Sequence, residues 1–188
     1  MTTQNQTAAA TQGLWVFDPF HTQVAFAAKH LGMMTVRGTF LELTATGYID
    51  PEHPEASAAE VTIQTASLNT HNPERDLGLR SAPFLAVDQH PTMSFTSTSI
   101  AQTGRDRYTM TGDLTIKGHT RPVTFAVVKY GEFTDPTTGH RIGYSAQAQI
   151  NRQDFGLDFD AMLAGRWVVS EEVEIVIEGI GTLSNRYE

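Results

Sequence analysis

The stretch YTMTGDLTIKGHTRPVTFAV, residues 108–127, decides the fold class. From Tyr108 to Ile116 the residues at even positions are mostly apolar, whereas those at odd positions are polar. This alternation is typical of an antiparallel strand that buries one face and exposes the other. The segment KGHTRP follows and supplies turn residues, after which an apolar side chain recurs at every second position from Val123 to Val127. The stretch therefore predicts two antiparallel strands joined by a turn.

The same two-residue period recurs along much of the chain. It is clear at 142–150 and 173–177 and weaker at 35–49, 59–68 and 92–100. Clusters of glycine, proline, aspartate and asparagine separate these runs and supply the turns. With an opening strand, the pattern predicts about eight strands. Only NPERDLGLRSAPFL, at 72–85, has helical spacing, and because strands and helices do not alternate, a parallel sheet is excluded.

Eight sequential antiparallel strands protect their edges best when they close into a barrel. Such a barrel is just wide enough either to pack its interior shut or to enclose one ligand, so the size of the inward side chains decides between the two. The strands carry small residues where a filled barrel would favour leucine or phenylalanine: Ala28, Ala126, Ala146 and Ala148. These residues favour an open interior. The alternative is a self-packed interior in which Phe40, Phe95 or Phe125 reaches across the barrel.

Composition and charge narrow the class of protein. The chain has 188 residues, of which 40% are hydrophobic and 18% charged, and this predicts one compact domain with a sizeable core. The formal net charge is -8 and no lysine- or arginine-rich run is present, which disfavours nucleic acid as a partner. The chain contains no cysteine, so disulfides, thiol catalysis and sulfur-ligated metal sites are excluded.

The first residues, MTTQNQTAAATQG, are small, polar and uncharged. They lack the basic and apolar regions of a secretory signal, and no run in the chain approaches the length of a transmembrane helix. We therefore expect a disordered tail over 1–13, a barrel domain over 14–188 and a cytoplasmic location.

Six blocks, in order from Trp15 to about Ile180, together resemble the YceI-like family. They are WVFDPFHTQVAFAAKH (15–30), VRGTF (36–40), ERDLGLRS (74–81), HPTMSF (90–95), GDLTIKG (112–118) and INRQDFG (150–156). The resemblance implies an extended lipocalin-like antiparallel barrel, often dimeric, that binds a long-chain lipid such as a polyisoprenoid or an isoprenoid quinone. The family's usual block has a histidine where this chain has Gly78, so no role of that position carries over.

The candidate ligand-binding residues are those that the alternation and the resemblance place inside the barrel. They are Phe26, Ala28, His30, Phe40, Leu114, Ile116, Phe125, Tyr144, Ala146, Ala148, Ile150 and Arg152.

Two histidines flank the opening strand. On a strand that runs through Val24, Phe26 and Ala28, parity places His30 on the same face and His21 on the other, so they do not converge on one ion. Because no HExxH or HxH spacing occurs either, we expect no metal site. We expect His21 to anchor the start of the strand by hydrogen bonding. His30 is either a core histidine with one hydrogen bond or a polar contact for a ligand.

Two other charged motifs each have two interpretations. Arg152 shares a face with Ala148 and Ile150, so it either forms a structural ion pair with Asp154 or Asp158 or donates to a ligand head group. In ERDLGLRS the charges alternate in sign, which fits pairing along a helix surface. The alternative is that this helix contacts a lid over the barrel mouth.

These observations predict a lipid-binding protein without catalytic residues or cofactor, whose partner is a long-chain isoprenoid or fatty lipid, a fatty amide included. A homodimer is expected from the resemblance. Two alternatives from other classes stay open: a small enzyme that acts on a hydrophobic substrate with His30 as general base, and a structural dimer with a self-packed barrel.

Overall fold

The computed structural model describes residues 12–158, 162–163 and 166–184. The tail expected over 1–13 lies almost wholly outside this range, and the first strand begins at Gly13. Among the described residues, none of the helices has the length and apolar character needed to cross a bilayer.

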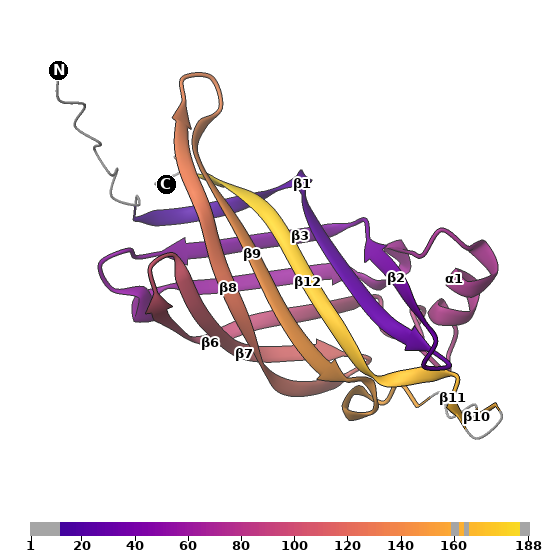
Figure 1. The fold of residues 1–188 in the computed structure, drawn as a ribbon. Helices are drawn as coiled ribbons and strands as arrows, with labels where there is room; N and C mark the ends of the chain where they lie inside the picture. The colour runs from indigo at the N-terminus through magenta and orange to yellow at the C-terminus, as the bar shows by residue number, and fades with distance from the viewer. Residues whose placement is uncertain (1–11, 159–161, 164–165, 185–188) are drawn as a thin grey trace, which may run out of the picture.

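Strands make up most of the described chain (Figure 1). They are β1 Gly13–His30, β2 Met34–Phe40, β3 Leu43–Ile49, β4 Ala58–Gln64, β5 Leu68–Asn69, β6 Thr92–Gly104, β7 Arg107–Ile116, β8 His119–Asp135, β9 Gly139–Asn151, β10 Met162–Leu163, β11 Arg166–Trp167 and β12 Val169–Leu183. The helical elements are η1 Pro54–Ala56, η2 Thr65–Ser67, α1 Pro73–Arg80 and η3 Arg152–Phe155.

Eight of these strands close into the predicted antiparallel barrel. The order β12-β9-β8-β7-β6-β4-β3-β1 is completed by pairing of β1 with β12, so every strand of the barrel has two neighbours. β1 is long enough to pair with two strands in succession: its first residues pair with β3 and its last residues pair with β2. The weak pattern at 35–49 is therefore two strands rather than one, with a break at Leu41 and Glu42.

The hairpin of β7 and β8 has the geometry that its alternation predicts. Ile116 pairs with His119 across a two-residue turn in which Lys117 and Gly118 both have positive φ, of 50° and 76°. Such turns match the twist of the strands that they connect. Leu114, Ile116 and Phe125 are buried. Ala126, in contrast, is exposed. The prediction that its small side chain helps to leave the interior open is therefore wrong.

The inward parity of β1 changes within the strand. Phe17 pairs with Gly181 of β12 and Thr22 pairs with Gly179, so residues 18–21 lie opposite Ile180 alone. Trp15, at an odd position, is fully buried before this bulge, and Val24, at an even position, is buried after it. The expected hydrogen bond of His21 is present, from its Nδ1 to Asp18 Oδ2 at 2.6 Å. It stabilises this bulge inside β1 and not the start of the strand.

Helix α1 lies at one end of the barrel (Figure 1). Its N-cap is Asn72, whose side chain accepts a hydrogen bond from the backbone of Arg75. The charges of the helix do not follow the expected pattern of surface pairing. Asp76 is buried and accepts hydrogen bonds from the backbone and the hydroxyl of Thr70, while Arg80 donates to the carbonyl of Leu68. These contacts tie α1 to the chain around β5, because the buried groups find their partners there.

Candidate ligand-binding site

The barrel encloses two cavities of about 150 and 160 Å³. We call the first the tyrosine cavity, because Tyr48, Tyr108 and Tyr144 contribute to its wall. We call the second the helix cavity, because Leu79 of α1 contributes to its wall. Both linings include Val24, Val61 and Ile177, so the two cavities meet at this level. The barrel is therefore not packed shut, although Phe95 and Phe125 make an edge-to-face contact inside it.

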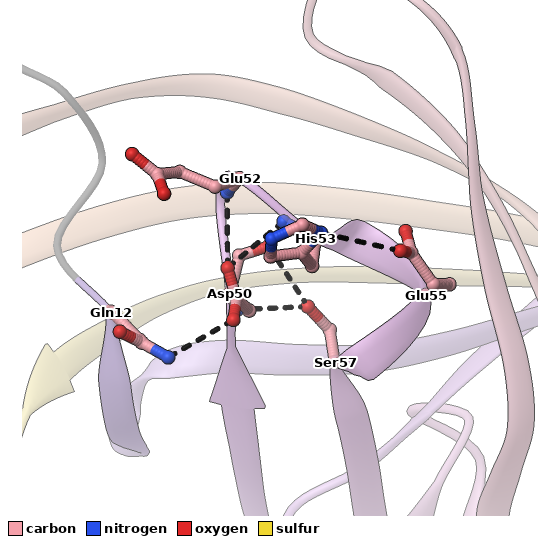
Figure 2. A network of polar contacts seen from close by, with 6 residues as sticks. All are labelled: Gln12, Asp50, Glu52, His53, Glu55 and Ser57. Carbon is pink, nitrogen blue, oxygen red and sulfur yellow. Dashed lines mark hydrogen bonds and ion pairs between the residues drawn. The ribbon is translucent and has the colours of Figure 1, made fainter.

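The turn between β3 and β4 forms part of the wall of the tyrosine cavity, through Asp50, Pro51, Pro54 and Ser57. Asp50 organises this turn: its carboxylate accepts hydrogen bonds from Gln12 Nε2 and from the backbone of Glu52 and His53, at 2.9 to 3.0 Å (Figure 2). Its own backbone N–H donates to Ser57 Oγ at 2.9 Å. Asp50 is 9% exposed, and both of its carboxylate oxygens accept hydrogen bonds within this network.

A cluster of ionisable side chains flanks the same cavity. Lys129 lines the cavity, and its Nζ lies 3.2 Å from Glu132 Oε1. The second oxygen of Glu132 lies 3.2 Å from His140 Nε2, and the other ring nitrogen of His140 lies 2.7 Å from the hydroxyl of Thr134. The side chains of Lys129, Glu132 and His140 are only 14%, 8% and 13% exposed, so solvent screens their interactions weakly.

Tyr144 lies on the cavity wall next to this cluster. Burial, followed by the nearby Tyr108, Glu132 and Asp106, raises the pKa of its hydroxyl well above the ordinary value. Tyr144 keeps its proton at neutral pH, as an ordinary tyrosine does, and burial extends this to more alkaline pH.

The helix cavity has a different character, because the surface that faces it is apolar. Phe26 and Phe40 pack against each other with ring centroids 5.6 Å apart, and Leu114 and Ile116 continue the wall. Gly38 of β2 makes room for Phe26, since a Cβ atom there would lie 2.4 Å from the ring. Leu79, Phe84 and Leu85, from α1 and the loop after it, complete the lining.

Ten of the twelve residues expected inside the barrel line these cavities. Tyr144 and Ala146 line the tyrosine cavity, and the helix cavity is lined by Phe26, Ala28, Phe40, Leu114, Ile116, Phe125, Ile150 and Arg152. The two-residue period identifies the nine that lie on strands, because each strand of the barrel keeps one face inward over most of its length, whereas Arg152 begins η3 just after β9.

Ala148 and His30 line neither cavity. Ala148 packs against the core and lies on β9 between Ala146 of the tyrosine cavity and Ile150 of the helix cavity. It is therefore placed at the level where the two cavities meet. His30 lies outside the cavity walls because the pairing of β1 with β12 has a second irregularity there. Ala28 pairs with Val173 and His30 with Val169, so β12 bulges opposite Lys29 and the regular wall ends there.

Arg152 lines the helix cavity but has a mainly structural geometry. It is 2% exposed, its Nε donates to the carbonyl of Ser170 at 3.1 Å, and its Nη1 donates to the carbonyl of Leu157. Within the described residues, no ion pair of Arg152 with Asp154 or Asp158 is recorded, and the recorded partners are these two backbone carbonyls. The guanidinium holds the end of β9 against the start of β12.

Sequence analysis missed Tyr108 and Lys129, which both line the tyrosine cavity. The signal for each was present. Tyr108 begins the same even-numbered face as Leu114, and Lys129 follows Val127 by two positions on the inward face of β8. Only the fold shows that Glu132 is the partner of Lys129 and so offsets the cost of a lysine on a buried face. Among residues 12–158, 162–163 and 166–184, no group of three or more potential metal ligands is found.

Fold and cavities together define a lipocalin-like antiparallel barrel with two apolar cavities in its interior. The chain belongs to the YceI-like family, because the model of the YceI-like domain matches residues 15–179. A UPF0312 protein of Azotobacter vinelandii is 38% identical over 162 residues, which cover 85% of this chain and 82% of the relative. The resemblance seen in the sequence blocks is thereby confirmed.

The chain is also similar to solved structures. BcnA of Burkholderia cenocepacia superposes with a TM-score of 0.78 at 22% identity, covering 88% of this chain and 99% of BcnA. A polyisoprenoid binding domain from Saccharophagus degradans superposes with a TM-score of 0.65 at 14% identity, covering 93% of this chain and 100% of that domain. At these identities the two structures support the fold.

Proposed function

We propose that this protein binds one long-chain apolar lipid inside its barrel, for carriage, storage or sensing, without catalysing a reaction. The lipid is a polyisoprenoid, an isoprenoid quinone or a fatty amide. The observation that carries the proposal is the pair of apolar cavities that meet at Val24, Val61 and Ile177. The description of the Saccharophagus degradans domain as polyisoprenoid binding supports it.

Burial of the apolar chain supplies the driving force. About 25 cal/mol is gained per Å² of apolar surface removed from water, or about 0.8 kcal/mol per methylene. A chain of a few isoprene units gains on the order of 10 kcal/mol before the cost of association. The ten cavity-lining residues predicted from the sequence are the proposed contacts, together with Tyr108 and Lys129.

The geometry gives the enzyme alternative no support. That alternative assigned the general base to His30, which lines neither cavity. A homodimer and a cytoplasmic location, expected from the sequence, stay predictions.

The proposal is tested on protein purified without added ligand. Organic extraction and mass spectrometry are expected to find a long-chain lipid in stoichiometric amount, because an open apolar cavity takes up such a molecule in the cell. A fluorescent prenyl probe is expected to bind the extracted protein. If preparations from several hosts yield no lipid and the probe does not bind, the proposal is wrong.

A further inference from the structure

A groove that opens to solvent lies at the bulge of β1. It has a volume of about 700 Å³, and we call it the bulge groove. Its lining brings residues of the bulge together with residues of three neighbouring segments, among them Pro19, Phe20, His21, Leu41, Tyr130 and Ile180. Thr22, Tyr144 and Gly179 line both the bulge groove and the tyrosine cavity. The same residues therefore form the wall between the groove and the interior of the barrel.

The backbone of the wall is interrupted at this place. Residues 18–21 of β1 have no partner on β12, because the register passes from Phe17 to Thr22. On the other side, β1 pairs with β3 up to Val16 and with β2 only from Val24. Among the described strands, residues 18–21 therefore pair with neither neighbour, although inter-strand pairs hold β1 before and after them.

Side chains hold the bulge to itself rather than to the barrel. The carboxylate of Asp18 accepts a hydrogen bond from the backbone N–H of Phe20 at 2.9 Å, and its other oxygen lies 2.6 Å from Nδ1 of His21. These contacts fix the local shape of the bulge without tying it to β12 or β2. A segment without inter-strand pairs opens at a lower free-energy cost than the paired strand around it.

The packing behind the bulge depends on Gly179. A Cβ atom there would lie 2.9 Å from Oγ1 of Thr22 and 3.1 Å from the ring of Phe17, which also lines the tyrosine cavity. Side chains of β1, and none from this position of β12, thus fill the space between groove and cavity. Within the described residues, the buried Oγ1 of Thr22 has no hydrogen-bond partner that would fix it there. Movement of β1 away from Gly179 would therefore connect the two spaces.

The bulge groove exposes apolar side chains to water. Phe20 is 93% exposed, Tyr130 68% and Leu41 64%. Large hydrophobic side chains that gather around a groove are typical of a site that binds an apolar ligand. The lining also contains the carboxylate of Glu178, which disfavours an anionic group in the groove. The occupant that fits is an uncharged apolar chain.

We propose that the bulge groove is an outer subsite for the apolar chain of the lipid, and that the lipid enters and leaves the barrel here. The bulge and Thr22 move away from Gly179 of β12 and so connect the groove with the tyrosine cavity. This inference rests on the proposed function and adds the route that the ligand takes.

A reversible cross-link tests the route. Thr22 and Gly179 pair directly and the chain contains no cysteine, so the double variant Thr22→Cys, Gly179→Cys carries the only two thiols. The short distance from a Cβ atom at 179 to Oγ1 of Thr22 suits a disulfide. Stopped-flow fluorescence measures association and dissociation of the fluorescent prenyl probe with delipidated protein. Oxidation is expected to slow both rates at least about tenfold and to leave the Kd within about twofold, because a gate changes access and not the bound state.

Reduction with dithiothreitol should restore both rates. The double variant Ala126→Cys, Gln147→Cys is the matched control, because these exposed residues pair directly between β8 and β9 and line none of the three spaces. Its oxidation should leave both rates unchanged. Equal rates for oxidised and reduced Thr22→Cys, Gly179→Cys protein would overturn the route, while binding of the probe would still support the proposed function. If not even the wild type binds the probe, the proposed function itself is overturned.

Phe20→Ser tests the outer subsite without a change in the wall. Phe20 is 93% exposed, so the variant is expected to fold normally, and it decides the inference if the cross-linked variant does not fold. Association of the probe is expected to slow about threefold, because the incoming chain loses an apolar contact. Phe133→Ser is the control, since Phe133 is 56% exposed and lies outside the groove. Equal association rates for the two variants would overturn the assignment of the subsite.

Discussion

At the scale of single residues, small side chains leave the interior of the barrel open. A few buried polar side chains make its two ends chemically different. Ala28 and Ala146 leave space where larger residues would fill it, and both line a cavity. Tyr144 and Lys129 add donors at one end. The cost of burying Lys129 is offset by Glu132, which lies three residues further along the same strand.

The first prediction at this scale concerns Ala148. In Ala148→Phe the ring is expected to enter the space where the two cavities meet, because Ala148 lies between Ala146 and Ile150 on the inward face of β9. Affinity for a long-chain lipid should fall about tenfold, which is about 1.4 kcal/mol. The free energy of unfolding of the delipidated protein should change by less than about 1 kcal/mol, since the ring does not overpack a filled core.

A binding titration and urea denaturation measure the two effects separately. Gln147→Phe is the control, because Gln147 is the next residue and is exposed. A strongly destabilised Ala148→Phe variant that still binds lipid normally would contradict the placement of the cavities.

A second prediction follows from the buried hydroxyl of Tyr144. Its pKa is raised above the ordinary value of 10.0, so above that pH the unfolded chain loses a proton that the folded chain retains. Stability is then lost as pH rises from about 10 toward the higher pKa of the fold. Tyr144→Phe is expected to lose less free energy of unfolding than the wild type between about pH 9 and pH 11. Urea denaturation at several pH values measures this, and the exposed Tyr130 gives Tyr130→Phe as control. Equal pH profiles for Tyr144→Phe and wild type would contradict the prediction.

At the scale of elements, one strand and one helix determine how the barrel is completed. β1 pairs with β12 along most of its length, with β3 at its start and with β2 at its end. The bulge at residues 18–21 lets both halves of β1 present buried residues to the interior. Helix α1 lies at the opposite end of the barrel from the β3–β4 turn (Figure 1). The two ends of the site are thus formed by local elements attached to a continuous wall.

The attachment of α1 gives a prediction at this scale. Asp76→Ala is expected to lower the free energy of unfolding by about 1–3 kcal/mol, because the buried backbone N–H of Thr70 loses its acceptor. The loosened helix should also weaken lipid binding, since Leu79 lines the helix cavity. Urea denaturation and amide hydrogen exchange over 70–85 measure the two effects. Glu74→Ala, an exposed change in the same helix, should stay within about 0.5 kcal/mol of wild type. Equal effects of the two substitutions would argue against the tether.

At the scale of the whole molecule, closure of the sheet links the free energy of unfolding to ligand binding, because the cavities exist only in the folded chain. In the proposed function the apolar wall surrounds the lipid, so the lipid binds the folded chain and not the unfolded one. Delipidated protein is expected to be less stable than the lipid complex by about 2.7 kcal/mol when the free lipid is at a hundred times its Kd. Differential scanning calorimetry with and without the fluorescent prenyl probe measures the shift in Tm. An unchanged Tm at saturating probe would contradict binding inside the barrel.

The sequence by itself determined the strands, the faces of those strands and most of the cavity wall. These features follow from a local rule, because successive side chains of a strand point to opposite sides. The sequence alone therefore predicts the even-numbered apolar face from Tyr108 to Ile116 and the turn at Lys117 and Gly118.

Only the tertiary structure decided where that rule is interrupted and what the polar residues contact. The parity change in β1 depends on pairing with β12, whose residues are more than a hundred positions away. The tether of Asp76 to Thr70 replaces an expected surface ion pair, and Arg152 bonds the carbonyls of Ser170 and Leu157, which the sequence did not suggest. In both cases a buried polar side chain bonds the partner that folding brings within reach. A buried polar group without a hydrogen-bond partner would lower the free energy of unfolding.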